Sequence, residues 1–281
     1  MATKGVVLFA HNNGRINYVR QAVYCARQIR RHLDLPTTLV TSTPEALTKS
    51  FKTVFKSVVT VETPVDSNIK TFRDARHKRF KSPWYNFNRA DAYDVSPYDE
   101  TIVMDTDYIL ANDSLLGCFK TNSDFQIWKG GHYINTVMSE WSIRKVSDGT
   151  IDMYWATVFY FRKTKKMNVF FNLVKHVRDN WDYYRYIYMI PTLQYRNDHA
   201  FSIAIHTMNG YRPADEWPVA PPGNLYYSYD RDELQDFDGK TFTVFLADTS
   251  SQNNMSVTRL TKENLHVMNK LSLERFIDRV I

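Results

Sequence analysis

The feature that most constrains the fold of this chain is a short apolar run that ends in closely spaced carboxylates. Residues 101–104 are apolar or β-branched, and Asp105-Thr106-Asp107 follows directly. Such a run is typical of a strand that is buried on both faces of a parallel or mixed sheet. Ligands bind at the carboxyl ends of strands in open α/β sheets, so we expect Asp105 and Asp107 at a ligand site. Carboxylate oxygens suit Mg²⁺ or Mn²⁺, and such an ion would neutralise a bound diphosphate.

The same spacing of carboxylates occurs twice more, in Asp230-Arg231-Asp232 and Asp236-Phe237-Asp238. Both pairs lie within residues 229–240, a polar stretch that ends in a turn signal and contains no apolar strand. We therefore interpret this stretch as a solvated loop and favour Asp105 and Asp107 as the metal site. The alternative interpretation of Asp105 and Asp107 is an acidic turn after a buried strand.

The residues before this motif predict a strand, a turn, a helix and a second strand. Residues 5–10 have a buried-strand pattern, and residues 11–14 favour a turn at which a ligand can approach the backbone. Apolar residues then recur at helical spacing over residues 16–33, and residues 37–41 form the next strand. The chain therefore opens as a β-α-β unit.

The remaining elements alternate without an internal repeat or a low-complexity linker. Further strands are expected at residues 57–61, 124–128, 153–161 and 241–246. Helices are expected at residues 86–93, 167–180 and 198–208, with a mostly helical tail over residues 261–281. Asp198 is well suited to cap the helix that follows it. One α/β domain is the simplest organisation of the 281 residues.

Basic residues outnumber acidic ones, 36 to 30, and the excess is concentrated in one segment. This segment runs directly into Trp84, Tyr85 and Phe87. Its basic residues are Lys70, Arg73, Arg76, His77, Lys78, Arg79 and Lys81. Clustered cations with neighbouring aromatic side chains suit phosphates and bases, so the segment is a candidate contact for a polyanion. The alternatives are a solvated face and a loop that closes as a lid over a bound diphosphate.

The sequence disfavours several classes of protein. The longest apolar or aromatic runs are far too short to span a bilayer, and the first residues lack a signal-peptide pattern. We therefore expect a cytoplasmic protein without a membrane partner. Cys25 and Cys118 fit neither a disulfide framework nor a zinc site, and both have the small or apolar neighbours typical of buried thiols.

The order of these parts resembles the glycosyltransferases of the GT-A fold, in which a nucleotide-binding half with a D-x-D motif joins an acceptor half. The matching segments span most of the chain and are residues 8–12, 102–107, 155–158, 197–200 and 265–270. The resemblance implies a single GT-A type α/β domain with a Rossmann-like mixed central sheet and helices on both faces. Residues of about 1–110 would form the nucleotide-binding half, and residues of about 111–281 the acceptor half with a closing C-terminal segment.

The resemblance also implies a reaction and a metal site. The reaction is metal-dependent transfer of a sugar from a nucleoside diphosphate donor, by family habit a UDP-sugar, to an acceptor hydroxyl. In the glycogenin-like branch, a histidine near the C-terminus is the third metal ligand and a following lysine holds the diphosphate. This places His266 on the metal and Lys270 on the phosphates. The motif H-x-x-G-x-x-K-P-W of that branch is absent here, and the alternative for His266 is a partly exposed helical histidine.

Further residues are assigned by their place in the same order. The donor contacts are Ala10, His11, Asn12, Arg89, Asp105 and Lys270. The acceptor contacts are Trp84, Tyr85, Trp155 and Thr157. Asp198 is the catalytic candidate, either as the base for the acceptor hydroxyl or as a residue that orients the sugar.

A second similarity concerns the acceptor. Residues 96–99 and 266–270 are similar to segments of small sugar transferases of tailed phages, some of which modify hydroxymethylated cytosine in DNA. This similarity implies a hydroxymethylated pyrimidine in double-stranded DNA as the favoured acceptor, and the host cytoplasm as the location of a phage-encoded chain. An extruded base needs aromatic contacts, for which Trp84, Tyr85, Trp155 and residues 183–186 are candidates. The alternatives are a saccharide acceptor, a D-x-D phosphatase and a nucleic-acid-binding protein without chemistry.

Overall fold

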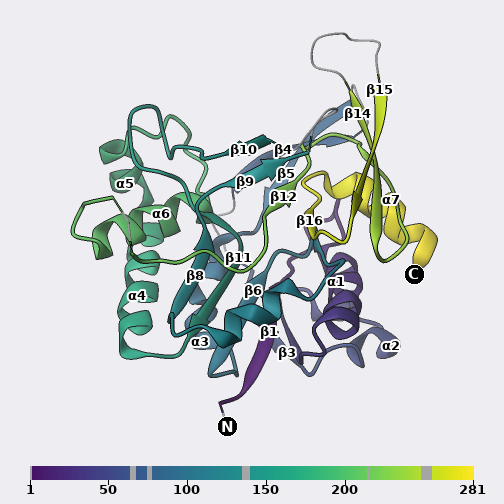
Figure 1. Ribbon diagram of the computed structural model, residues 1–281, viewed down its shortest axis with the longest axis horizontal. Helices are drawn as coiled ribbons and strands as arrows, with labels where there is room; N and C mark the ends of the chain where they lie inside the picture. Colours follow the sequence, from purple (N-terminus) through teal and green to yellow (C-terminus); the bar gives the residue numbers. More distant parts are fainter. Residues whose placement is uncertain (1, 64–67, 75–77, 135–139, 214–215, 248–254) are drawn as a thin grey trace.

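A six-stranded sheet with the strand order β3-β2-β1-β6-β11-β8 forms the centre of the computed structural model (Figure 1). The structure describes residues 2–63, 68–74, 78–134, 140–213, 216–247 and 255–281. The strands of the sheet are β1 (Lys4–Phe9), β2 (Thr37–Thr41), β3 (Ser57–Thr60), β6 (Glu100–Met104), β8 (Phe125–Trp128) and β11 (Trp155–Arg162). The first four strands of the order are parallel, whereas β11 is antiparallel to both β6 and β8. The predicted mixed sheet is therefore confirmed.

Strand β6 occupies the interior of this sheet, between β1 and β11. All five of its residues are buried, which confirms the expectation from its continuous apolar run. Because β1 and β6 are parallel, their carboxyl ends meet at one edge of the sheet. That edge holds the turn after β1 and the carboxylates after β6.

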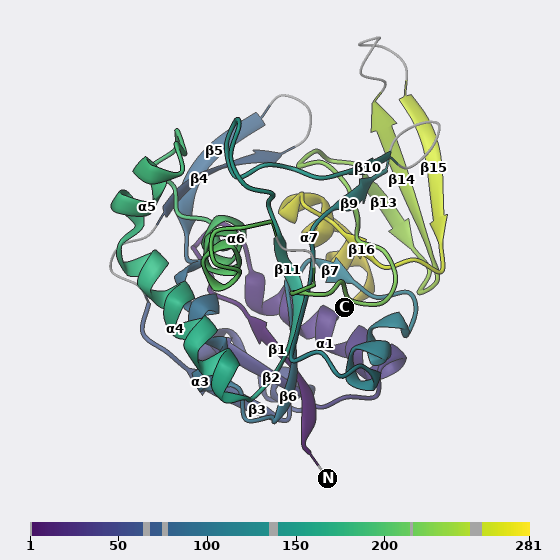
Figure 2. The same ribbon diagram turned by 60° about the vertical axis from the view of Figure 1, so that its left-hand side comes forward.

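Helices cover both faces of the central sheet (Figure 2). Helix α1 (Tyr18–His32) lies on one face, where its apolar stripe is buried, and the Asn17 side chain caps it by accepting the Arg20 N–H. Helices α4 (Lys165–Asp179) and α6 (Asn197–Met208) cover the other face. There Phe201 of α6 packs on Phe159 of β11, with ring centroids 4.8 Å apart. The remaining short helices are η1 (Pro44–Ala46), α2 (Lys49–Lys52), η2 (Phe87–Asp91), α3 (Ala92–Val95), η3 (Ser114–Lys120) and α5 (Trp181–Ile187). None of the helices in the described ranges has the length and apolar character needed to cross a bilayer.

A second sheet brings the C-terminal segment to the carboxylates after β6. Its strands, in order, are β10 (Glu140–Ser142), β9 (Gly131–Tyr133), β12 (Tyr226–Tyr227), β16 (Leu265–His266) and β7 (Tyr108–Ile109). Strand β16 pairs with β7 so that His266 lies opposite Tyr108. The expectation of a mostly helical tail is therefore wrong for its first part, because this stretch forms a strand before helix α7 (Lys270–Val280) begins.

A third sheet, β13 (Leu234–Phe237), β14 (Thr241–Ala247) and β15 (Met255–Thr261), projects beside α7 (Figure 1). Strand β14 confirms the predicted strand, but the loop expected over residues 229–240 is wrong for Leu234–Phe237, which form β13. Phe237 of β13 stacks on Phe242 of β14 with ring centroids 4.0 Å apart. The charged neighbours of Phe237 concealed this half-buried strand, which has only a short apolar face.

The basic segment forms a β-hairpin rather than a loop. Strands β4 (Asn68–Asp74) and β5 (Lys78–Trp84) pair in antiparallel register, with Phe72 opposite Phe80. The two rings stack at 5.6 Å on one face of the hairpin, which explains why this charged segment is ordered. Arg76 and His77, which belong to the predicted polyanion contact, lie outside the described residues.

Candidate metal and nucleotide site

The turn after β6 fixes the positions of the two carboxylates. The backbone N–H of Asp105 donates to the carbonyl of Thr157 in β11 at 2.8 Å, and the N–H of Tyr108 donates to the Asp105 carbonyl at 3.1 Å. The Val267 N–H donates to the Asp107 carbonyl at 2.9 Å. The motif is therefore held between the central sheet and the C-terminal segment.

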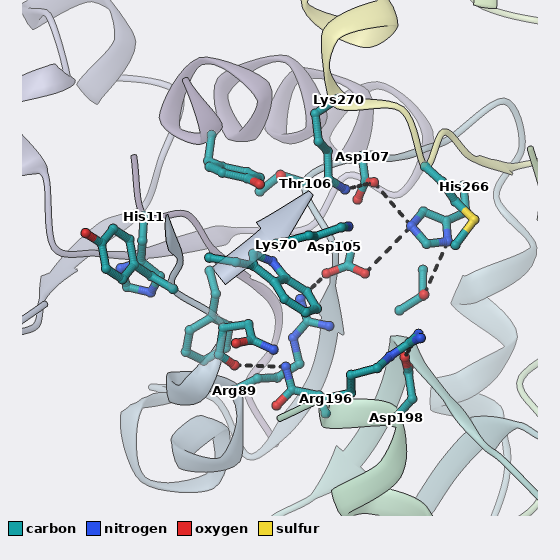
Figure 3. A pocket seen from close by; sticks show the side chains of 18 of the residues that line it. His11, Lys70, Arg89, Asp105, Thr106, Asp107, Arg196, Asp198, His266 and Lys270 are labelled. Atoms are coloured by element: carbon teal, nitrogen blue, oxygen red, sulfur yellow. Dashed lines mark hydrogen bonds and ion pairs between the residues drawn. The ribbon is translucent and has the colours of Figure 1, made fainter. Parts of the chain in front are cut away.

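His266 completes a group of three potential metal ligands (Figure 3). Its Nε2 atom lies 3.2 Å from Oδ2 of Asp107 and 3.9 Å from Oδ2 of Asp105. Ligand atoms of the three residues all lie within 4.8 Å of one another. On the other side of the ring, Nδ1 lies 3.3 Å from the Thr157 hydroxyl, which orients the imidazole. His266 belongs to a strand and is only 6% exposed, so the alternative of a partly exposed helical histidine is wrong.

Two cationic side chains contact these carboxylates. The Lys270 ammonium donates to Asp107, and the Arg89 guanidinium donates to Asp105 and, at 2.7 Å, to the Ala156 carbonyl. Burial alone would raise the pKa of Asp107, but Lys270 and His266 outweigh it and hold this pKa below its ordinary value. A carboxylate that is ionised and already attracts cations has the chemistry required of a ligand for a divalent ion.

A carboxylate at the end of a strand is expected at the surface, where alanine could replace it with the fold intact. Asp107 is 1% exposed, so this expectation is wrong. The prediction that it could be replaced by alanine without cost to the fold was based on that expectation. Replacement would remove the partner of Lys270, and breaking a buried ion pair costs about 3–5 kcal/mol. Asp105, whose side chain is 23% exposed, is the better position for a test of metal binding.

The carboxylates and His266 line a cavity of about 280 Å³. Eleven of the residues assigned from the sequence line it, namely His11, Trp84, Tyr85, Arg89, Asp105, Asp107, Trp155, Thr157, Asp198, His266 and Lys270. Ala10 and Asn12 do not. Ala10 is buried and its N–H donates to Val40 at 2.9 Å, while Asn12 uses its side chain to accept the Val19 N–H at 3.0 Å. Both therefore support the turn after β1.

His11 offers the cavity a hydrogen-bond donor. Its Nδ1 atom accepts the Ser42 backbone N–H at 3.1 Å, and burial together with Arg89 lowers its pKa to about 4. A neutral imidazole whose Nδ1 accepts must carry its proton on Nε2. That Nε2 is buried and has no hydrogen-bond partner among the described residues, so it is available to an acceptor atom of a ligand.

Asp198 lies in the first turn of α6 but does not cap it, so the predicted capping role is wrong. The N-cap position is Arg196, which makes no capping contact with its side chain. The Asp198 carboxylate instead accepts the Ala156 N–H at 2.9 Å and an Arg196 N–H at 2.7 Å. Although burial would raise the pKa of Asp198, Arg196 lowers it, and the group remains ionised.

The cavity also contains residues that sequence reasoning did not assign to it. Tyr18 and Asp230 line it. Tyr18 belongs to no recognisable motif, whereas Asp230 belongs to the second pair of spaced carboxylates, which we interpreted as part of a solvated loop. Lys70 also projects into it, 4.8 Å from the Trp84 ring centroid, and burial together with Lys270 lowers its pKa to about 8. Alternation along a hairpin would have identified Lys70, because Lys70, Phe72 and Trp84 share one face.

The predicted aromatic contribution of residues 183–186 is not found in this cavity. These residues belong to α5, which lies at the far side of α4 and α6 from the C-terminal helix (Figure 1). Tyr183 is 63% exposed and Tyr186 is 83% exposed. Trp84, Tyr85 and Trp155 are therefore the aromatic residues of the earlier assignment that a ligand in the cavity could contact.

The fold and the site define a mixed α/β protein with a carboxylate and imidazole cluster at the carboxyl edge of its parallel strands. No family model and no curated protein matches the sequence. Similar solved structures include the galactosyltransferase LgtC in complex with donor and acceptor sugar analogues, at 14% identity and a TM-score of 0.40, covering 70% of this chain and 68% of that one. The glycosyltransferase GlyE of Streptococcus pneumoniae TIGR4 is 13% identical with a TM-score of 0.38, covering 73% of this chain and 43% of GlyE. The bifunctional IspDF of Campylobacter jejuni is 11% identical with a TM-score of 0.35, covering 81% of this chain and 49% of IspDF. The chain thus spans less than half the length of these last two proteins.

Proposed function

We propose that this chain is a metal-dependent glycosyltransferase that moves a sugar from a nucleoside diphosphate, UDP in the simplest case, to an acceptor hydroxyl. The observation that carries the proposal is the convergence of Asp105, Asp107 and His266 within 4.8 Å in a cavity that also contains Arg89 and Lys270. Two carboxylates and one imidazole suit Mn²⁺ or Mg²⁺, and the cationic groups beside them suit a diphosphate.

In the transfer, the acceptor oxygen forms a bond to the anomeric carbon, and the bond from that carbon to the diphosphate breaks. The diphosphate leaves with the electron pair, and its released oxygen takes the proton that the acceptor hydroxyl loses. A divalent ion on Asp105, Asp107 and His266 would neutralise the departing diphosphate. Lys270 adds a positive charge at the same place, where negative charge develops. Arg89 keeps Asp105 in position, and the Nε2–H of His11 binds an acceptor atom of the donor.

Asp198 is assigned to orientation in this proposal rather than to proton removal. Both of its oxygens already accept hydrogen bonds, and its lowered pKa makes it a weak base. Its contact with Ala156 holds the start of β11, where Trp155 and Thr157 line the cavity. The acceptor therefore lies against Trp155, with Trp84 and Tyr85 as further contacts.

As acceptor we propose a hydroxymethylated pyrimidine in DNA. An extruded base would stack on the aromatic side chains Trp84, Tyr85 and Trp155, and the basic hairpin would face the neighbouring phosphates. A saccharide is the alternative acceptor, because sugars also stack on tryptophan and tyrosine. The same cavity serves either acceptor, so the choice is made by experiment.

The test is transfer of labelled sugar from a panel of nucleotide sugars, with Mn²⁺ or with a chelator, to hydroxymethylated DNA, unmodified DNA and oligosaccharides. We expect metal-dependent transfer by the wild type and a loss of roughly 10²–10³-fold in Asp105→Asn. Asp236→Asn, from the D-x-D spacing in β13, is the matched control and should retain activity. Hydrolysis of a generic phosphate ester in place of sugar transfer would favour the phosphatase instead. Label in oligosaccharides alone would exclude the DNA acceptor and leave the glycosyltransferase standing.

A further inference from the structure

A groove lined by arginines adjoins the metal and nucleotide cavity. Its volume is about 700 Å³, and it shares Asp230 and Met268 with the cavity. The arginines that line it are Arg73, Arg79, Arg144 and Arg231. They come from the hairpin, from the segment after β10 and from the segment before β13, so the groove forms only in the folded chain.

The register of the hairpin separates the groove from the cavity. Arg73 and Arg79 lie directly opposite each other, and side chains alternate between the two faces of a β-hairpin. Arg73 and Arg79 therefore share one face, whereas Lys70, Phe72 and Trp84 share the other. The second face lines the cavity and the first lines the groove.

The arginines of the groove form no ion pair with a carboxylate in the part of the chain that the structure describes, although Arg231 acts electrostatically on Glu233. Arg144 lies over the rings of Trp155 and Tyr227, at 4.9 and 5.3 Å from their centroids. Arg231 lies over Tyr229 at 5.6 Å, and Tyr229 in turn stacks on Tyr133 at 3.8 Å. Aromatic faces position these two guanidinium groups, and none of the described side chains occupies their N–H donors, which suits a ligand.

Nearby acidic side chains are already engaged. Asp74 pairs with Arg275 at 2.7 Å and with Lys78 at 3.5 Å, which removes Lys78 from the predicted set of free cations. Asp230 accepts the Asn269 side-chain N–H at 3.0 Å. Among the residues that line the groove, the four arginines outnumber the one carboxylate, Asp230, so the lining carries a net positive charge next to the reaction site.

We propose that this groove binds phosphate groups of the acceptor, which identifies the acceptor of the proposed transferase as a phosphate-bearing molecule. Guanidinium groups bind phosphate oxygens in pairs, and four of them could hold more than one phosphate. The donor diphosphate belongs to the metal ligands and Lys270 in the cavity, so the groove is left for the other substrate. Phosphate binding by the groove does not depend on the proposed function. The inference rests on the proposed function only where it identifies the bound molecule as the acceptor.

The test measures binding rather than turnover. A labelled single-stranded oligonucleotide, a hexose phosphate and a neutral oligosaccharide are titrated against the wild type at several salt concentrations. The groove variant is Arg73→Gln with Arg79→Gln. The matched control is Arg30→Gln with Lys49→Gln, which removes the same charge from exposed residues of α1 and α2. UDP with Mn²⁺ is titrated against the same proteins and reports on the cavity separately.

We expect at least one phosphate-bearing probe to bind the wild type and the control, and to bind the groove variant about 10-fold or more weakly. An oligonucleotide that binds with a salt slope of about 0.7 per phosphate contact would identify a nucleic-acid acceptor. Binding of the hexose phosphate alone would identify a small phosphorylated acceptor. The inference would be overturned if neither the oligonucleotide nor the hexose phosphate bound the wild type. It would also be overturned if the control variant lost as much affinity for the probe as the groove variant. An equal loss of UDP affinity in the groove variant would overturn it as well. If the wild type did not bind UDP in the presence of Mn²⁺, that result would instead contradict the proposed function.

Discussion

His199 shows how burial at a single residue makes the stability of the protein depend on pH. Its ring stacks on Trp181 with centroids 6.1 Å apart, and burial together with Arg196 lowers its pKa from 6.5 to about 4. Between about pH 4 and pH 6.5, His199 therefore binds a proton in the unfolded chain but not in the folded chain. This contribution to stability is therefore fully present above pH 6.5 and is lost as the pH falls towards 4.

We expect this residue to account for a loss of about 3 kcal/mol in the free energy of unfolding between pH 7 and pH 4. His199→Gln, which cannot be protonated, should show a correspondingly shallower dependence. The measurement is urea unfolding of both proteins across this range. Equal slopes for the variant and the wild type would show that His199 is not held neutral.

The site residues differ in how far the sequence could predict them. Asp105 and Asp107 directly follow a strand whose apolar pattern is evident from a few consecutive residues. Their place at the sheet edge could therefore be predicted. Nothing local marks His266, because its role depends on the pairing of β16 with β7, and only the family resemblance identified it. Asp230 lay in a stretch interpreted as loop, and its approach to the cavity depends on long-range packing.

Among the elements, the C-terminal helix is joined to the basic hairpin by Asn269, in addition to the ion pair of Arg275 with Asp74. Oδ1 of Asn269 caps α7 by accepting the Ser272 N–H at 2.8 Å, and its Nδ2 donates to the Arg73 carbonyl at 2.9 Å and to Asp230 at 3.0 Å. The residue is fully buried. It therefore couples the positions of Lys270, at the start of α7, and of the arginines that line the groove.

We expect Asn269→Ala to lower the free energy of unfolding by about 2–3 kcal/mol, because it removes a cap and leaves buried acceptors without donors. Thr164→Ala, which removes the side-chain hydroxyl that caps α4 by accepting the Met167 N–H, should cost about 1 kcal/mol. Urea unfolding of the two variants gives the comparison. A cost of Asn269→Ala no greater than that of Thr164→Ala would show that the connection to the hairpin adds no stability.

The elements that could be predicted were those with a strong period. Strands β1, β2, β6, β11 and β14 and helices α1, α4 and α6 were predicted from continuous apolar runs or helical spacing. The hairpin of β4 and β5 was missed because Arg73, Arg79 and Lys81 make half of its exposed face basic, although Phe72 and Phe80 alternate correctly on the other face. Strands β7, β12 and β16 have two residues each, too few for any periodic pattern.

On the scale of the whole molecule, three distant parts of the chain meet at the carboxyl edge of the central sheet. They are the turn after β6, the β16–α7 segment and the β4–β5 hairpin (Figures 1 and 3). The first supplies carboxylates, the second supplies an imidazole and an ammonium group, and the third supplies the wall between cavity and groove. The net charge of +6 agrees in sign with anionic ligands. The groove, which four arginines and one carboxylate line, carries part of that excess next to the cavity.

The central claim is that Asp105, Asp107 and His266 bind a divalent ion together with a nucleoside diphosphate. The most direct measurement is a titration of Mn²⁺ followed by electron paramagnetic resonance, with and without UDP, on the wild type, Asp105→Asn, His266→Gln and the control Asp236→Asn. Thermal unfolding of each protein establishes that it is folded. We predict that UDP strengthens Mn²⁺ binding by the wild type and the control, and that both site variants bind Mn²⁺ about 10–100-fold more weakly. Wild-type affinity for Mn²⁺ in Asp105→Asn and His266→Gln, with UDP present, would contradict the claim.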